Sequence, residues 1–216
     1  MQVHSDYSHP DPEVVAGFES IPSSIAGDVM GRRRCTSAEL SPMSRPVEPV
    51  AGSVLTVETP AGSNYSLHRA LEHVQPGDVL VVDAEGGTHR AVWGELMSRY
   101  AATRDLAALV IDGAIRDLDA QSAVGYPIYC RGGTPRGPTK VEQGTIGATV
   151  SCDGVSVAAG DVAVCDDDGV AFVPRDEATG VLSACEDKLD QEDDWMAAVE
   201  ETDTTTLEII GYERET

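Results

Sequence analysis

Two uninterrupted apolar runs constrain the fold of this chain more than any other feature. Residues 79–82 read VLVV, and residues 106–111 read LAALVI. A strand with one solvated face alternates apolar and polar residues, whereas a strand covered on both faces stays apolar. Helical patterns occur at residues 63–78 and 90–105. The alternation of strands and helices over residues 53–131 therefore predicts an α/β fold with a mostly parallel sheet.

The following segment has a different pattern, in which short apolar runs are divided by turn signals. Within residues 145–174 three dipeptides of Asp and Gly mark these turns: Asp153-Gly154, Gly160-Asp161 and Asp168-Gly169. Such dipeptides are typical of hairpins, so this part predicts a β-hairpin-rich half beside the mostly parallel α/β half. From about Glu177, apolar residues recur at helical spacing and predict a last helix. Residues 206–210 (TLEII) predict a short strand in the tail.

The chain length of 216 residues fits one domain with extensions. We expect residues 1–12 to form a flexible arm, because they are polar and contain two prolines. Residues 13–176 are expected to form the domain, with two short helices at its start, the second capped by Ser23 or Ser24. Residues 177–216 are expected to form a C-terminal helix and tail that pack on the domain or on a neighbouring subunit.

The charge balance excludes one class of partner. The chain has 37 acidic and 15 basic residues, for a net charge of −22, and only Lys140 and Lys188 are lysines. Binding of nucleic acid needs a basic surface, so no nucleic-acid partner is expected. Salt screens the self-repulsion of such a surface, with a Debye length of about 3 Å at 1 M. The composition therefore predicts a halophilic protein.

Two further absences in the sequence bear on location. No stretch approaches 18 apolar residues, so no membrane span is predicted. The five cysteines are scattered without a C-x-x-C pair, which favours reduced cysteines over a disulfide framework or a zinc site. Together with a start that lacks the pattern of a secretory signal, these features predict a cytoplasmic protein.

Charged residues follow the two apolar runs at the positions where parallel sheets gather their sites. Gly94-Glu95 follows the first strand and its connection, and Arg116-Asp117 follows the second, just after Asp112-Gly113, which we interpret as a turn. Carboxylate oxygens suit Mg²⁺ or Mn²⁺, and arginine grips a carboxylate with two hydrogen bonds. The pattern is thus consistent with a site for a metal and a small 2-oxo acid. A surface ion pair or helix cap is the alternative.

Three blocks of sequence occur in the order and spacing of one known family. They are GDVLVVDAEGGTHRAVWGELMSRYA, LVIDGAIRDLDAQSAVGYPIYCRGGTPRGP and VSVAAGDVAVCDDDGVAFVP. From about Ile21 to Pro174 the chain resembles the 4-hydroxy-4-methyl-2-oxoglutarate aldolase family, also called the regulator-of-RNase-E-activity-A-like (RraA-like) family. The resemblance implies a layered α/β/β/α sandwich that assembles as a homotrimer or hexamer, with sites between subunits.

The resemblance also implies an activity and the residues that carry it. The activity is that of a class II, metal-dependent pyruvate aldolase or oxaloacetate decarboxylase, with Mg²⁺ or Mn²⁺ as cofactor. Asp117 would be the metal ligand, Arg116 would bind pyruvate and stabilise its enolate, and Glu95 would lie near a metal-bound water. The pyruvate carboxylate would be held by amides at Gly94, Leu96 and Met97.

Two positions qualify this assignment. Catalytic members of the family usually carry an acidic residue three positions after the aspartate, but here that residue is Ala120. Asp119 is expected to point away from Asp117. Glu192 is a candidate to reach a neighbouring site, although a solvated acidic residue is the alternative. Because the family also contains non-catalytic regulators that bind a protein partner, that function stays open beside the lyase.

Overall fold

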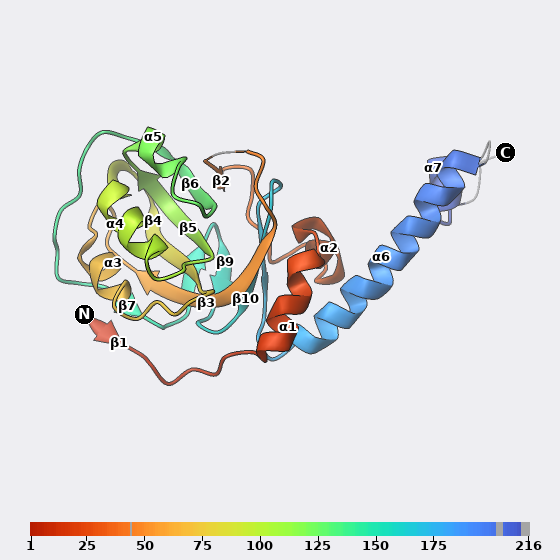
Figure 1. The fold of residues 1–216 in the computed structure, drawn as a ribbon, viewed down its shortest axis with the longest axis horizontal. Coiled ribbons are helices and arrows are strands. Elements are labelled where there is room, and N and C mark those ends of the chain that lie inside the picture. Colours follow the sequence, from red (N-terminus) through yellow and green to blue (C-terminus); the bar gives the residue numbers. More distant parts are fainter. Residues whose placement is uncertain (44, 202–204, 213–216) are drawn as a thin grey trace.

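A mixed β-sheet forms the centre of the molecule, and helices cover its outer faces (Figure 1). The computed structural model describes residues 1–43, 45–201 and 205–212. The main path of the sheet runs in the order β1 (Gln2–Val3), β7 (Thr145–Ile146), β3 (Val50–Glu58), β4 (Val79–Trp93), β5 (Ala108–Ile115), β6 (Ile128–Gly133) and β2 (Ser41–Pro42). Strands β3 to β6 are parallel to one another, as the sequence predicts.

Burial on both faces explains the uninterrupted apolar run of β4. Leu80 and Val82 belong to a core that includes residues of α3 (Tyr65–Ala70) and α4 (Glu95–Ala102). Val79 and Val81 belong to a second core on the other face of the sheet, which the hairpin strands complete. All four side chains are fully buried. Neither face of β4 meets water here, so the strand has no polar positions.

The C-terminal half supplies two hairpins and most of the outer helical layer. The first hairpin joins β8 (Val150–Cys152) to β9 (Val155–Val157) through Asp153-Gly154, both at positive φ. The second joins β10 (Val162–Cys165) to β11 (Val170–Val173) and pairs with the first residues of β3. A third core lies between these last strands and the helices α1 (Pro12–Gly17), α2 (Ser23–Val29) and α6 (Ala178–Glu201). The fold is the α/β/β/α sandwich that the family resemblance implies.

Strand β4 is longer than predicted. The expected helix at residues 90–105 begins only at Glu95, because Ala91 and Trp93 still pair with Ala114 and Ile115 of β5. Register shifts between Asp83 and Trp93 let β4 bulge away from β5 and return to it. Ala91, Val92 and Trp93 are all buried. Tertiary burial therefore overrides the helical pattern at these positions.

Asp112-Gly113 is not the predicted turn but lies inside β5 (Ala108–Ile115). The buried Asp112 carboxylate forms an ion pair with Arg131 and accepts the Asp153 N–H at 2.7 Å. A Cβ on Gly113 would lie 2.9 Å from the Ala84 Cβ. The glycine is thus needed where β4 passes close to β5, and the aspartate ties the β8–β9 hairpin to the sheet.

The two ends of the chain also differ from expectation. Gln2 and Val3 of the expected arm pair in parallel with β7. The predicted strand at residues 206–210 is instead the helix α7 (Thr206–Ile209), because Thr205 and Glu208 make a reciprocal capping box. Helix α2 is capped by neither Ser23 nor Ser24. Instead, Asp166 accepts the Ser23 N–H at 2.7 Å.

All five cysteines are free, and four of them are buried. Burial raises the pKa of the Cys130 thiol to about 11, as suits a packing residue. Among the described residues, no helix combines the length and apolarity needed to cross a membrane. Helix α6 projects from the body of the molecule, on the side opposite to α3, α4 and α5 (Leu118–Gln121) (Figure 1).

Candidate functional site

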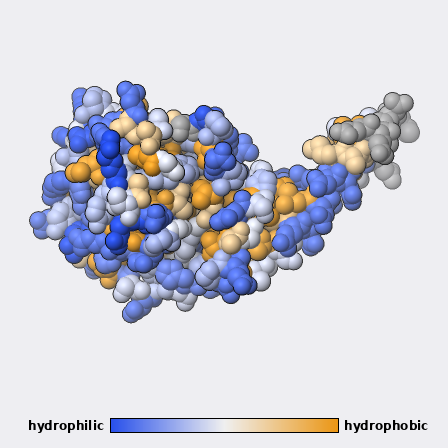
Figure 2. All heavy atoms as spheres, in the orientation of Figure 1, coloured by the Kyte–Doolittle hydropathy of each residue, from blue (hydrophilic) through white to orange (hydrophobic). Residues whose placement is uncertain are grey.

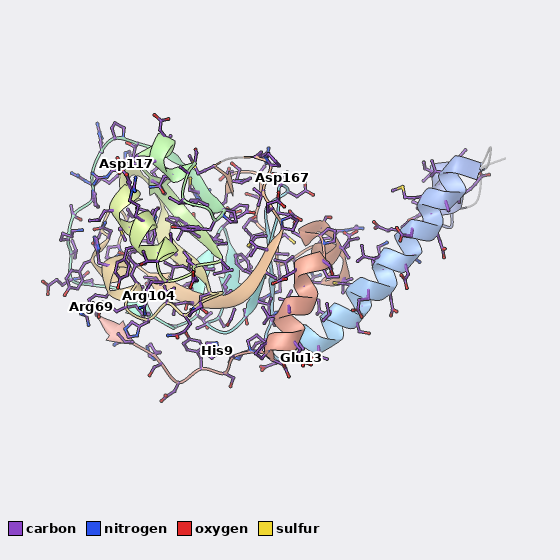
Figure 3. The ribbon with its side chains drawn as sticks, viewed as in Figure 1. His9, Glu13, Arg69, Arg104, Asp117 and Asp167 are labelled. Atoms are coloured by element: carbon purple, nitrogen blue, oxygen red, sulfur yellow. The ribbon has the colours of Figure 1, made fainter. Side chains whose placement is uncertain are left out.

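Arg116 and Asp117 lie directly after β5, beside the end of β4. Trp93 and Ile115 are paired at the ends of these two strands, and the Arg116 N–H donates to the Trp93 carbonyl at 3.0 Å. The carboxyl ends of the two parallel strands therefore meet at one edge of the sheet, as the sequence predicts. Figure 3 shows Asp117 at this edge, remote from α6.

Gly94 makes room for the arginine and the aspartate. A Cβ at this position would lie 2.7 Å from Asp117 Oδ2 and 3.0 Å from Arg116 Nε. The backbone of Gly94 is extended, so the constraint is one of space and not of backbone conformation. On its other side the Arg116 guanidinium passes close to Gly137, where a Cβ would lie 3.0 Å from Nη1. Two glycines thus frame the side chain of Arg116.

The Asp117 carboxylate is held at the start of α4. Its Oδ2 accepts the Glu95 N–H at 3.0 Å and lies 3.5 Å from Arg116 Nε. Asp117 has φ 60° and ψ 45°, a left-handed conformation that aspartate adopts more readily than most residues. The N-terminus of a helix and a guanidinium both stabilise a negative charge. The side chain is still 41% exposed, so ligands can reach it.

A buried network fixes the backbone beneath this pair. Trp93 Nε1 donates to Ser98 Oγ at 2.5 Å, and Ser98 Oγ donates in turn to Gln121 Oε1. Gln121 Nε2 then donates to the Arg116 carbonyl at 3.1 Å. All three side chains are buried, so each polar group needs its partner. The network connects β4, α4 and α5 to the backbone of the site.

A cavity of about 650 Å³ opens on one side of Arg116. Four of the residues predicted from the sequence line it: Gly94, Leu96, Met97 and Arg116. The other residues that line it were not predicted: Asn64, Tyr65, His68, Trp93, Pro138, Lys140 and Glu142. Trp93 is the last residue of β4, and the others come from the start of α3 and from the loop before β7, which sequence periodicity does not connect. A second hollow, on the side of Asp117, is lined by Arg116, Asp117, Leu118, Gly133, Thr134 and Pro135.

The cavity concentrates positive charge in a strongly acidic protein. Lys140 Nζ donates to Asn64 Oδ1 at 2.5 Å and lies 2.7 Å from His68 Nε2. Burial and the nearby Arg116 lower the pKa of Lys140. Burial and the charge of Lys140 lower the pKa of His68. Arg116 and Lys140 line the cavity together with one acidic residue, Glu142. The two cationic side chains suit the cavity to a small molecule with more than one carboxylate.

The remaining predicted residues lie close by but differ in availability. Glu95 Oε1 accepts from Arg99 Nε at 2.7 Å in a partly exposed ion pair. The Met97 N–H donates to the Gly94 carbonyl at 3.1 Å, whereas the Leu96 N–H has no hydrogen-bond partner among the described residues. The N–H of Leu96 is therefore free to donate a hydrogen bond to a carboxylate oxygen. Its side chain is 77% exposed.

The residues around Asp117 suit a metal that keeps most of its water. No group of three or more His, Cys, Asp or Glu side chains in the described part of the chain has the arrangement of a metal site. Mg²⁺ commonly binds through one or two carboxylates and several waters, so the exposed Asp117 alone fits such an ion. Asp119 and Ala120 line a hollow of about 300 Å³ together with Asp117. Asp119 therefore lies beside Asp117 at this hollow, two residues further along the chain.

Glu192 lies on α6, outside the site of its own chain. It pairs with Lys188 one turn earlier, at 3.4 Å, and α6 points away from the edge that carries Asp117 (Figures 1 and 3). Contact of Glu192 with a site would therefore require a second copy of the chain.

Comparisons with known proteins agree with this fold. The family model RraA-like, described as Aldolase/RraA, matches residues 23–172. A protein of Halalkalibacterium halodurans named "Putative 4-hydroxy-4-methyl-2-oxoglutarate aldolase" is 34% identical over 181 residues, which cover 84% of this chain and 86% of that protein. The structure of Streptomyces coelicolor RraAS2, described as an unusual member of the RNase ES inhibitor RraA protein family, is 30% identical. Its TM-score is 0.76 over 87% of this chain and 97% of that one.

A further solved structure supports the fold alone. An uncharacterized protein from Pseudomonas syringae pv. tomato has a TM-score of 0.81 at 22% identity, and the match covers 94% of this chain and all of that chain.

Proposed function

This chain belongs to the RraA-like family, and from that premise we propose that it is a metal-dependent lyase. Its reaction would cleave a 4-hydroxy-2-oxo acid, of the 4-hydroxy-4-methyl-2-oxoglutarate type, to pyruvate. Decarboxylation of oxaloacetate is the related reaction, since both pass through the enolate of pyruvate. The observation that carries the proposal is the Arg116–Asp117 pair, for which Gly94 leaves room, beside a cavity that is also lined by the cationic Lys140.

Four residues of this chain would bind the substrate or a water molecule. Arg116 would grip the carboxylate of the 2-oxo acid and place an N–H donor where negative charge develops on the keto oxygen. The free N–H of Leu96 would donate a hydrogen bond to a carboxylate oxygen. Lys140 would bind the second carboxylate of the substrate. Glu95 would hold a water molecule at its carboxylate, as the proton carrier for the enolate.

Asp117 is the residue that would hold Mg²⁺ or Mn²⁺. Such an ion supplies Lewis-acid polarisation of the keto group. Either ion accepts oxygen ligands, and the side chains present do not select between them.

The surface around the site supports an assembly of several copies. Four large apolar side chains near the site are at least 40% exposed: Leu96, Tyr100, Leu118 and Val141. Leu96 and Leu118 line the two hollows beside Arg116, Val141 is the neighbour of the lining residue Lys140 in the sequence, and Tyr100 lies one turn after Leu96 on α4. Covering them with another subunit would remove apolar area from water. We therefore propose a homotrimer or hexamer with the site between subunits, and α6 as a segment that contacts a neighbour.

A non-catalytic regulator is the second candidate function. It is favoured by the similarity to RraAS2, whose description names it among RNase ES inhibitors. Under this alternative, the acidic surface would bind a basic protein partner. Metal binding separates the two functions, because a regulator of this kind has no need of a cation at Asp117.

The test is release of pyruvate in molar potassium chloride. The purified protein would be given 4-hydroxy-4-methyl-2-oxoglutarate or oxaloacetate, with Mg²⁺, Mn²⁺ or a chelator. We expect metal-dependent release above the rate of the metal alone. Absence of release from either substrate, together with no calorimetric binding of Mg²⁺ or Mn²⁺, would favour the regulator.

A further inference from the structure

His68 contacts the Lys140 ammonium group in the cavity but has no part in the reaction as proposed. It lies on α3, in the first turns of a helix that also carries Tyr65, and its ring is half-buried. Its Nε2 is 2.7 Å from Lys140 Nζ, and both residues line the cavity. Asn64 Oδ1 provides the other contact of the ammonium group, at 2.5 Å.

The chemistry of this contact fixes the state of the ring. An ammonium group has three N–H donors and no acceptor, so Nε2 of His68 accepts from Lys140 and the ring proton lies on Nδ1. Two of the three donors of Lys140 are then satisfied by Asn64 and His68. The third is available to a ligand in the cavity. Burial and the charge of Lys140 lower the pKa of His68 and so favour the neutral ring that can accept.

We propose that His68 is a positioning residue, which holds the Lys140 ammonium group in the cavity and so creates the site for a second carboxylate of the ligand. This inference rests on the proposed function, since that function requires a ligand with two carboxylates. His68 would act only through Lys140. It would set the preference for dicarboxylates over monocarboxylates, and not the rate of the chemical step.

Other charged groups near the ring do not replace this role. Arg116 and Glu142 line the same cavity, and Glu72 lies in the turn that follows α3, where it pairs with Arg69 at 3.0 Å. None of them has a hydrogen bond or ion pair with Lys140 among the described contacts. Lys140 itself is exposed overall, so only Asn64 and His68 keep its flexible side chain turned to the cavity.

Acid should release this arrangement. Protonation of His68 removes the acceptor and leaves two cations at hydrogen-bond distance, so the exposed Lys140 would turn to solvent. Because the pKa of His68 is lowered, the neutral ring and the carboxylate site persist to below the usual pKa of histidine. They are lost as the pH falls further. A direct role of His68 as a cation would give the opposite trend, since binding would then improve in acid.

The test compares two ligands that differ by one carboxylate. Malate and lactate would be titrated by calorimetry into the Mn²⁺-loaded protein, as wild type, His68→Leu and His68→Gln. We expect His68→Leu to weaken malate about tenfold, as for loss of one charge-assisted hydrogen bond, and lactate less than about twofold. His68→Gln, whose amide oxygen can accept from Lys140, should restore most of the malate affinity. His73→Leu, from the turn that follows α3 and outside this cavity, is the matched control.

Equal weakening of malate and lactate, a Gln variant no better than Leu, or tighter malate binding in acid would overturn the proposal. A second measurement is independent of ligands. The pKa of His68, followed by NMR, should rise in Lys140→Met, because the neighbouring charge is removed. An unchanged pKa would contradict the contact. Turnover is not needed for either measurement, so an inactive protein that passes both would refute the lyase but not the role of His68.

Discussion

At the scale of single residues, the site depends on the absence of a side chain at Gly94. The hypothetical Cβ at this position meets Asp117 Oδ2 and Arg116 Nε, both of which serve the proposed reaction. The neighbours are ends of side chains and not backbone, so they can move aside. A larger residue would therefore leave the fold intact and displace the reacting groups.

Gly94→Ala should lower kcat/KM for pyruvate release by about 100-fold, as expected for a small misplacement of catalytic groups. The free energy of unfolding should fall by only about 1 kcal/mol, typical of mild overpacking. Gly180→Ala on α6 is the control, since a Cβ there meets nothing within 4 Å. Steady-state kinetics and urea unfolding would check both values. Full activity in Gly94→Ala would show that the pair does not need its observed position.

Asp78 should make stability depend on pH. Burial raises the pKa of its carboxyl to about 6, and the Gln75 N–H and His9 only partly oppose the shift. A raised carboxyl pKa gives stability that is fully present below the unfolded pKa and is lost as the pH rises through about 6. Asp78→Asn should therefore stabilise the protein by about 3 kcal/mol at pH 8 and by almost nothing below the unfolded pKa. The measurement is denaturant unfolding of both proteins across this pH range. If the ionised carboxylate were stabilising, Asp78→Asn would instead have a lower free energy of unfolding than wild type at pH 8.

At the scale of helices and strands, hydrophobic periodicity predicts the elements well, but it predicts their ends and the contacts between them poorly. The buried runs of β4 and β5 and the turn signals of both hairpins are local features, so the sequence reveals them. The return of β4 to the sheet at Ala91–Trp93 depends on pairing with β5, and the cap of α2 comes from Asp166. Such contacts join residues that are far apart in the sequence, and no local pattern records them.

The same distinction divides the residues of the site. Glu95, Arg116 and Asp117 could be predicted because they follow strands whose carboxyl ends must meet. Asn64, His68 and Lys140 could not, because α3 and the loop before β7 approach each other only in the folded chain. A lysine in a chain that has only two was the one available signal.

The buried network under the site should couple α4 to the sheet. Ser98→Ala removes the partner of Trp93 Nε1 and of Gln121 Oε1, both buried. Leaving buried polar groups unpaired should lower the free energy of unfolding by about 1–3 kcal/mol. Ser122→Ala, an exposed serine on the turn after α5, should change it by less than about 0.5 kcal/mol. The free energies of unfolding would be measured with urea. Equal effects in the two variants would show that the network does not contribute to stability.

At the scale of the whole molecule, charge and apolar surface act against each other. Hydrophilic residues cover much of the visible face, and apolar residues gather where α6 leaves the body (Figure 2). The net charge of −22 opposes contact between copies in dilute salt, and screening removes that opposition. The exposed apolar residues near the site then favour association.

Light scattering should therefore show a trimer or hexamer in molar potassium chloride and smaller species as the salt is lowered. If the site lies between subunits, activity per subunit should fall as the assembly dissociates at low salt. A monomer at every salt concentration, with unchanged activity, would place the whole site within one chain.

The central claim is that Arg116 and Asp117 form a metal-dependent site for 2-oxo acids. The alternative interpretation is that the two residues form only a partly exposed ion pair. The direct measurement is pyruvate release against metal concentration for wild type, Arg116→Lys and Asp117→Asn. Arg116→Lys keeps the charge but loses the planar fork, so kcat/KM should fall by at least about 100-fold. Asp117→Asn should abolish metal-dependent release, with little recovery at high metal. Near-normal release in both folded variants, with at most about 1 kcal/mol lost in stability, would contradict the claim and leave only a surface ion pair.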